Sequence, residues 1–207
     1  MRGAMVPMAA LGAAAVGVLL WRRRRRQPEP PQWYHDLFAS AKRLHVDEWE
    51  NGSWWRLSNG WVGNDYCHGP DAGVRIIGYA LSGAGVGTKL VGACYYSPNA
   101  ESHKGLCHGG SMCSVMDDVI GWVGFCVSGE CLPWCGFTVQ VNTALQNPVP
   151  VGAWLRLEGE ITAVDRRKVH VKASLVAPPS DASGKEVVHC TADGLFIVKK
   201  GLENGHA

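Results

Sequence analysis

The longest regular pattern in the chain is a stripe of apolar residues at helical spacing between positions 109 and 126. Its members recur at positions i, i+3, i+4, i+7, i+8 and i+11, which is typical of a helix with one face in a core. The stripe consists of Met112, Val115, Met116, Val119, Ile120 and Val123. Asp117 lies on a different side of the same helix. The pattern predicts one long amphipathic helix that carries a carboxylate away from its buried face.

Alternation with a period of two dominates the regions on both sides of this helix. Before it, residues 75–81 and 89–96 read as two strands joined by a glycine-rich hairpin loop. After it, alternating apolar positions predict four more strands. Their expected buried faces are Val139, Val141 and Thr143; Leu155, Leu157 and Ile161; Val169, Val171 and Ala173; and Val188, Cys190, Ala192, Phe196 and Val198. This order of elements predicts an α+β fold, in which an antiparallel sheet wraps around one long central helix.

The chain begins with a segment of different composition. Residues 3–20 are almost wholly apolar and are followed by Trp21 and five consecutive arginines. The run is just long enough to cross a bilayer, and the basic block would hold the following domain on the cytoplasmic side. We therefore expect residues 1–21 to be a hydrophobic anchor or targeting segment. A cleaved signal peptide or a mitochondrial transit segment is the alternative.

Composition divides the remainder into four parts. Residues 22–32 are basic and proline-rich, which predicts a stiff linker. Residues 33–72 form a tryptophan-rich extension, in which a helix is expected over residues 35–50. The main domain covers residues 73–200, and residues 201–207 are a tail. The spacing that predicts the helix is that of Leu37, Phe38, Ala41 and Leu44. The tryptophans of the extension either cover the core and a sheet edge or form an aromatic platform for a ligand.

The distribution of charge argues against a nucleic-acid-binding domain. The formal net charge is +2, but Arg2 and the five arginines at 22–26 supply six of the twenty basic residues. From residue 27 onward, fourteen basic side chains stand against eighteen acidic ones. A mildly acidic body lacks the basic face that nucleic-acid-binding domains usually carry.

Eight cysteines are spread along the chain without a C-x-x-C pair. We expect reduced thiols that behave as small buried hydrophobic residues, consistent with a reducing compartment. A zinc site from Cys126, Cys131 and Cys135 with a histidine is the alternative, although the spacing suits it poorly. The sequence therefore predicts no metal and no cofactor.

The candidate chemistry lies at the start of the long helix. His108-Gly109-Gly110-Ser111 opens it, and Asp117 follows nine positions after the histidine. Two glycines at a helix start let a ligand approach free backbone N–H groups closely. The helix dipole adds positive potential there, so the position suits a carbonyl oxygen that becomes an oxyanion.

These residues resemble the hotdog-fold acyl-coenzyme A thioesterases, in particular the thioesterase superfamily members with a membrane or mitochondrial N-terminus. The likeness rests on the His-Gly-Gly sequence with its aspartate and on three later motifs. These are Thr138-Val139-Gln140-Val141-Asn142, Pro148-Val149-Pro150 and Asp165-Arg166-Arg167-Lys168. The resemblance covers roughly residues 73–200 and implies the hotdog fold.

The resemblance also implies roles for the site residues. The backbone N–H of Gly109 would polarise the thioester carbonyl, with Gly110 beside it, and Asp117 would act as general base or nucleophile. Thr138, expected from the neighbouring subunit of a homodimer, would orient the water or the carboxylate. His108 would shape the turn and form a hydrogen bond near the thioester.

Some positions depart from the family pattern. Ser102 stands where many relatives have an asparagine, and Gln146-Asn147 replaces a Lys-Arg pair. Arg167 and Lys168 are then left to meet the coenzyme A phosphates. Asp118 is equally acidic, but the nine-residue offset selects Asp117, so Asp118 is expected to be a solvated or helix-end carboxylate.

The resemblance thus implies hydrolysis of acyl-coenzyme A, with medium or long chains expected, by a homodimer or a dimer of dimers held at a membrane by its N-terminus. The alternative is a non-catalytic acyl- or lipid-binding hotdog module, which Ser102 and Gln146-Asn147 keep open. A hotdog dehydratase or hydratase is disfavoured because the chain has no matching acid–base pair.

Overall fold

The structure is a computed structural model. It describes residues 29–39, 43–44, 58–63, 66–69, 72–179 and 184–202. The expected anchor at residues 1–21, most of the linker and the tail from residue 203 lie outside these ranges. Within them, no helix is both long enough and apolar enough to cross a membrane.

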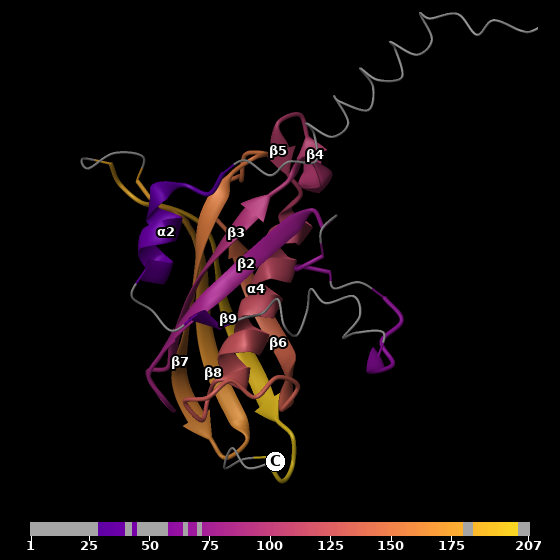
Figure 1. Ribbon diagram of the computed structural model, residues 1–207, viewed down its shortest axis with the longest axis vertical. Helices are drawn as coiled ribbons and strands as arrows, with labels where there is room; N and C mark the ends of the chain where they lie inside the picture. Colours follow the sequence, from indigo (N-terminus) through magenta and orange to yellow (C-terminus); the bar gives the residue numbers. More distant parts are fainter. Residues whose placement is uncertain are drawn as a thin grey trace, which may run out of the picture.

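A curved antiparallel sheet wraps around one long helix, α4 (Gly109–Phe125) (Figure 1). Before α4, the chain forms α2 (Gln32–Ala39), β1 (Arg43–Leu44), β2 (Val74–Ser82), β3 (Lys89–Tyr96), η2 (Pro98–Ala100), β4 (Glu101–His103) and β5 (Leu106–Cys107). After it come β6 (Gly136–Leu145), β7 (Trp154–Asp165), β8 (Lys168–Ala177) and β9 (Val187–Val198). The sheet order is β1-β2-β3-β7-β8-β9-β6. This is the hotdog arrangement, and the predicted fold class is confirmed.

The core forms where α4 meets the inner face of the sheet. Every residue of the predicted apolar stripe is at most 4% exposed. The sheet has glycines where the helix comes closest. A Cβ on Gly159 would lie 2.5 Å from Val123, and one on Gly194 would overlap Ile120. Glycine in a strand is typical of such a close approach. The helix is therefore held in one position against the sheet.

Strand β6 departs from strict alternation at the position that matters for the site. Its register against β9 shifts between Thr138 and Gln140, and Val139 is 57% exposed. The prediction that Val139 shares a face with Val141 and Thr143 is wrong. A bulge inserts one residue, which reverses the side on which the following residues lie. Thr138 consequently faces α4 together with Val141.

The expected helix over residues 35–50 is wrong at residues 43–44. Arg43–Leu44 pairs with β2 as the short edge strand β1, and the Arg43 guanidinium donates to the Ile77 carbonyl at 3.0 Å. Pairing with the sheet outweighs the helical spacing of Leu44, since tertiary context routinely overrides local propensity. Residues 45–57 lie outside the described ranges.

Among the tryptophans of the extension, Trp61 packs against aromatic residues near the end of α4. The ring centroid of Trp61 lies 4.7 Å from that of Trp134, which in turn lies 5.8 Å from that of Phe125 at the end of α4.

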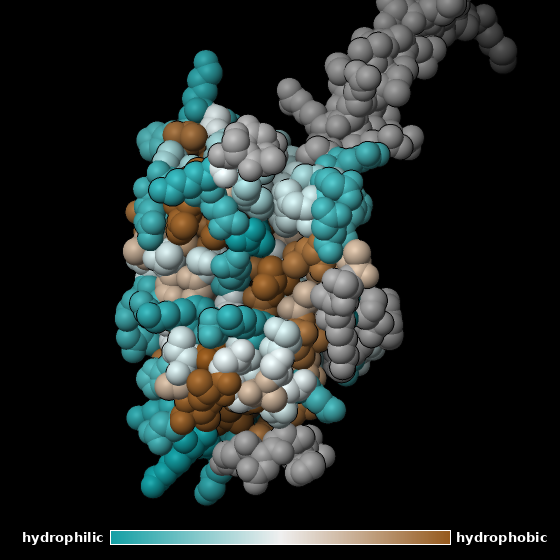
Figure 2. All heavy atoms as spheres, turned by 90° about the vertical axis from the view of Figure 1, so that its left-hand side faces the viewer, coloured by the Kyte–Doolittle hydropathy of each residue, from teal (hydrophilic) through white to brown (hydrophobic). Residues whose placement is uncertain are grey.

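The left-hand side of the molecule in Figure 1 is mainly hydrophilic, with smaller hydrophobic areas between (Figure 2). On the sheet, Lys89 pairs with Glu160 at 3.5 Å and Arg156 with Glu158.

Candidate active site

The start of α4 is closed by its own histidine. His108 is the N-cap, and its Nδ1 accepts the backbone N–H of Gly110 at 2.8 Å. An accepting Nδ1 means that the neutral ring carries its hydrogen on Nε2. The prediction that both glycine N–H groups are free is therefore wrong, because the Gly110 N–H already donates to the His108 ring. Of the two, the Gly109 amide is the one left to meet a ligand.

Both glycines are required by what surrounds them. A Cβ on Gly110 would lie 2.8 Å from His108 Nδ1, so a side chain there would displace the capping ring. A Cβ on Gly109 would lie 2.8 Å from Leu145 at the end of β6. The Gly-Gly pair thus permits the histidine cap on one side and close packing of β6 on the other.

Asp117 and Thr138 meet on the side of α4 that faces β6. They line a shallow groove together with Cys113, Ser114, Val139, Gln140 and Val141. Burial raises the pKa of the Asp117 carboxyl above its ordinary value, and the Asp118 charge raises it further. A hydrogen bond from the Thr138 hydroxyl opposes this rise without cancelling it. A carboxylate with a raised pKa is a stronger base than one with an ordinary pKa.

Thr138 lies beside Asp117 of its own chain in this groove; a contribution from Thr138 of a neighbouring subunit stays a prediction. The proximity within one chain results from the packing of α4 on β6. Gly121 follows Asp117 by one helical turn, and a Cβ there would lie only 3.4 Å from Thr138 Oγ1. The missing side chain lets the strand come close enough for the hydroxyl to reach the carboxylate.

Within one chain, the amide of Gly109 and the carboxylate of Asp117 are far apart. They are separated by eight residues of continuous helix, which corresponds to a rise of roughly 12 Å at about 1.5 Å per residue. One thioester carbonyl cannot contact both groups of the same helix.

Asp118 is neither solvated nor at a helix end, contrary to the prediction. Its carboxylate accepts the Tyr79 hydroxyl at 2.8 Å and lies 3.2 and 3.3 Å from Nε2 of His68, which must carry a proton to donate there. The Asp118 side chain is 17% exposed and that of His68 is fully buried. Burial raises the pKa of Tyr79 well above its ordinary value, and the Asp118 charge adds to this. The tyrosine therefore remains a hydrogen-bond donor.

We expect Asp118→Ala to lower the free energy of unfolding by about 1–3 kcal/mol, because the buried His68 and Tyr79 groups lose their acceptor. Asp118→Asn keeps an acceptor oxygen for Tyr79, so its loss should be smaller. Urea unfolding followed by circular dichroism measures both. Equal stability of Asp118→Ala and the wild type would show that the carboxylate contributes nothing to the fold.

The two cations predicted to bind coenzyme A do not converge on the groove within this chain. Arg167 donates to the Val198 carbonyl at 3.3 Å. Lys168 is exposed and pairs with Ile197, one residue from the Phe196 that faces the helix, so it lies on the outer side of the sheet. Asn147 donates to the Val188 carbonyl at 2.7 Å, and Gln146 to the Thr191 hydroxyl at 3.1 Å. These two amides therefore fasten the end of β6 to β9.

The eight cysteines are all free thiols, and six of them are buried. Burial raises the pKa of Cys135 to about 11 and that of Cys190 to about 11. Within the described residues, no group of three or more His, Cys, Asp or Glu side chains is placed to hold a metal ion.

The sheet wrapped around α4 defines the fold of the chain as a hotdog fold. The chain is homologous to the acyl-coenzyme A thioesterase THEM5. It is 27% identical to the mouse (Mus musculus) protein over 106 residues and 26% identical to the human (Homo sapiens) protein over 112 residues. These matches cover 50% and 53% of this chain, but only 39% and 41% of the relatives. The chain thus matches less than half the length of these relatives. No family model matches it.

Solved structures with a similar arrangement also exist. One is thioesterase superfamily member 2 from zebra fish, with a TM-score of 0.46 and 17% sequence identity. The matched region covers 62% of this chain and 83% of the zebra fish chain. A hypothetical thioesterase from Streptococcus pneumoniae, solved with coenzyme A, has a TM-score of 0.45 at 17% identity and covers 58% and 85%.

Proposed function

We propose that this protein hydrolyses acyl-coenzyme A thioesters, with medium- or long-chain substrates, to a free fatty acid and coenzyme A. The observation that carries the proposal is the Asp117–Thr138 pair: a solvent-accessible carboxylate of raised pKa, beside a hydroxyl, on the helix that begins with Gly109. The homology to acyl-coenzyme A thioesterase THEM5 supports the same substrate class.

We further propose that the active site forms between two copies of the chain. The roughly 12 Å between Gly109 and Asp117 on one helix is bridged if each carbonyl meets Gly109 of one copy and Asp117 of the other. Strand β6 ends the sheet order, and its Phe137 and Val139 are 62% and 57% exposed. An unpaired edge strand with apolar side chains favours pairing with a second copy, and a homodimer or a dimer of dimers follows.

In this site, Asp117 acts either as a general base or as a nucleophile. As a base, it takes a proton from water while the water oxygen attacks the thioester carbon. The carbonyl electrons move to oxygen, where the amide of Gly109 stabilises the negative charge. When the carbon–sulfur bond breaks, the sulfur receives the proton from Asp117. As a nucleophile, the carboxylate displaces coenzyme A, and water then cleaves the resulting anhydride. His108 shapes the turn and presents Nε2–H near the thioester.

The proposal extends to the rest of the chain. Residues 73–200 form the catalytic domain after a tryptophan-rich extension, residues 33–72. Residues 1–21 anchor it at a membrane with the domain on the cytoplasmic side, and a mitochondrial location is the alternative. Arg167 and Lys168 bind coenzyme A phosphates on the outer side of the dimer, away from the groove.

The direct test is release of free thiol from acetyl-, butanoyl-, octanoyl- and hexadecanoyl-coenzyme A by the full chain, followed with a thiol reagent. Turnover with the longer chains is the expected result. Binding of these esters without any thiol release would replace the proposal with the non-catalytic acyl-binding function.

A second prediction concerns pH. Thr138→Val removes the hydrogen bond that lowers the pKa of Asp117, so that pKa rises further. Because the carboxylate must be ionised to act, the acid limb of the kcat/KM profile should move to higher pH. Thr138→Ser keeps the hydroxyl and should leave the limb in place. An unchanged limb in the valine variant would show that Thr138 does not govern the ionisation of Asp117.

A further inference from the structure

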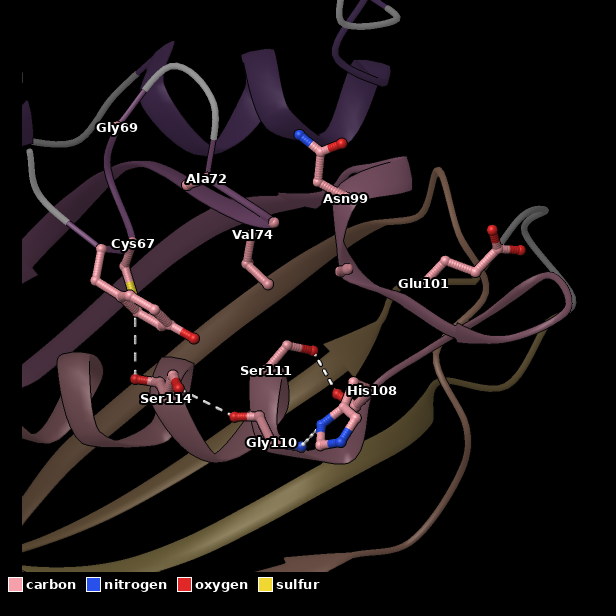
Figure 3. A pocket seen from close by; sticks show the side chains of 13 residues that line it. Cys67, Gly69, Ala72, Val74, Asn99, Glu101, His108, Gly110, Ser111 and Ser114 are labelled. Atoms are coloured by element: carbon pink, nitrogen blue, oxygen red, sulfur yellow. Dashed lines mark hydrogen bonds between the residues drawn. The ribbon is translucent and has the colours of Figure 1, made fainter.

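A cavity of about 760 Å³ opens at the first turns of α4 (Figure 3). Small-molecule sites commonly have volumes of about 300–1,000 Å³. Its walls come from the segment before β2, from the turn that follows β3 and from α4. Ser114 lines both this cavity and the groove of Asp117. The two hollows therefore adjoin along the same helix.

The interior of the cavity is apolar and its rim is polar. Cys67, Val74 and Ala100 are each 6% exposed, whereas Glu101 and His108 are exposed to solvent. In Figure 3, the Val74 side chain points from β2 into the cavity, toward α4. Small residues keep the space open: Gly69, Ala72, Gly73, Gly110 and Ser111.

The charge of the lining selects one part of an acyl-coenzyme A molecule. Among the described lining residues there is no lysine or arginine, and the carboxylate is that of Glu101. That carboxylate accepts the Gly105 amide at 2.7 Å and so is held at the rim. A diphosphate would meet negative charge there without a compensating cation, which is unfavourable. A hydrocarbon chain meets no such cost and gains from burial in the apolar interior.

The wall before β2 is fastened to α4 at several points. His68 pairs with Asp118 at 3.2 Å, and the Cys67 thiol donates to the Ser114 carbonyl at 3.9 Å. The Ile76 amide donates to the Cys67 carbonyl at 2.9 Å. These contacts fix the distance between the wall and the helix, so the cavity has a defined width.

We propose that this cavity binds the acyl chain of the thioester, and that Val74 and Cys67 limit the length of chain it accepts. The inference rests on the proposed thioesterase function. The cavity begins at His108 and Gly110, next to the Gly109 amide where the thioester oxygen would be bound. From that point, the coenzyme A portion extends toward solvent and the acyl portion enters the cavity.

The test is a chain-length profile of Val74→Phe in the full-length protein. The added ring occupies the space of the distal part of a long chain, and each excluded methylene costs about four-fold in affinity. The ratio of kcat/KM for hexadecanoyl- to butanoyl-coenzyme A should fall at least ten-fold. Val74→Ala should raise this ratio, which keeps the test valid if Val74→Phe fails to fold. Val86→Phe is the matched control, since Val86 is 62% exposed in the β2–β3 loop.

An unchanged ratio in both Val74 variants, with active enzyme, would overturn the cavity assignment and leave the thioesterase proposal intact. Absence of thiol release by the wild type would instead overturn the thioesterase proposal. In that case, calorimetry with hexadecanoyl-coenzyme A and free coenzyme A decides about the cavity. Tighter binding of the ester, reduced in Val74→Phe but not in Val86→Phe, supports the assignment. Equal binding of both compounds overturns it.

Discussion

Asp117→Asn is expected to lower kcat for thioester hydrolysis by about 10²- to 10⁴-fold, the usual contribution of a positioned acid–base group. Asparagine has the same shape and can still accept the Thr138 hydroxyl, but it cannot take a proton from water. Affinity for the acyl-coenzyme A should therefore persist while turnover is lost. Thiol release under saturating substrate measures kcat, and calorimetry measures binding.

The control is Asp193→Asn, an exposed carboxylate on β9 that points away from α4. It should leave kcat unchanged. Wild-type turnover by Asp117→Asn would show that the chemistry does not depend on this carboxylate, and the mechanism proposed above would be wrong.

The same variant can test the composite site. When Asp117→Asn subunits are mixed with subunits that carry Gly109→Pro, the mixed dimer regains one complete site, because each copy supplies the group that the other lacks. Proline lacks the backbone N–H and is tolerated at this first position of the helix. Activity above the sum of the two separate variants is the expected result. No gain on mixing, with subunit exchange verified, would place both groups of each site on one chain.

Phe196→Ala is expected to cost about 3–5 kcal/mol of unfolding free energy. The ring is fully buried and lies edge-on to Phe125 with 5.5 Å between ring centroids. It also fills the space left by two glycines, because a Cβ on Gly124 or Gly136 would overlap the ring. Removal of the ring therefore leaves a cavity between α4, β6 and β9.

Ile197→Ala is the matched control, because Ile197 is the next residue on β9, is only partly buried and faces the outer side. Its loss should stay near 1 kcal/mol, in line with removal of a partly buried aliphatic group. Urea unfolding followed by circular dichroism gives both values. Similar losses for the two variants would mean that the inner face of β9 does not carry the core.

The sequence predicts most of the fold because its strongest signals are periodic. Six apolar residues at helical spacing identify α4, and the alternation in β7, β8 and most of β9 matches the buried faces observed. Val188 is the exception, because a register shift after it breaks the alternation and His189 is buried instead. The bulge at Val139 could not be predicted, because one inserted residue leaves the local composition unchanged. Strand β1 could not be predicted, because Leu44 fits a helical pattern locally and its strand partner, Tyr79, lies thirty-five positions further along the chain.

For the site, the sequence singled out Asp117 and Thr138, and the structure brings the two together in one groove of a single chain. Asp118 was misjudged although a signal existed: it lies three residues after Val115 and four before Trp122, both buried. Helical spacing alone places it on the same face. Its partners, His68 and Tyr79, are 50 and 39 residues away, so only the tertiary structure shows what stabilises the charge. The occupation of the Gly110 amide likewise depends on the rotamer of His108.

Because of the bulge in β6, the loss of a single residue, Val139, which has no reactive group, would displace a residue of the site. Deletion of the codon for Val139 would restore regular pleating and turn either Thr138 or the rest of the strand away from α4. An equal deletion in the loop at residues 83–87, where three glycines with positive φ connect β2 and β3, would shorten a solvent-exposed turn. Among natural variants of this gene, in-frame losses should therefore be tolerated in the loop and removed by selection at Val139.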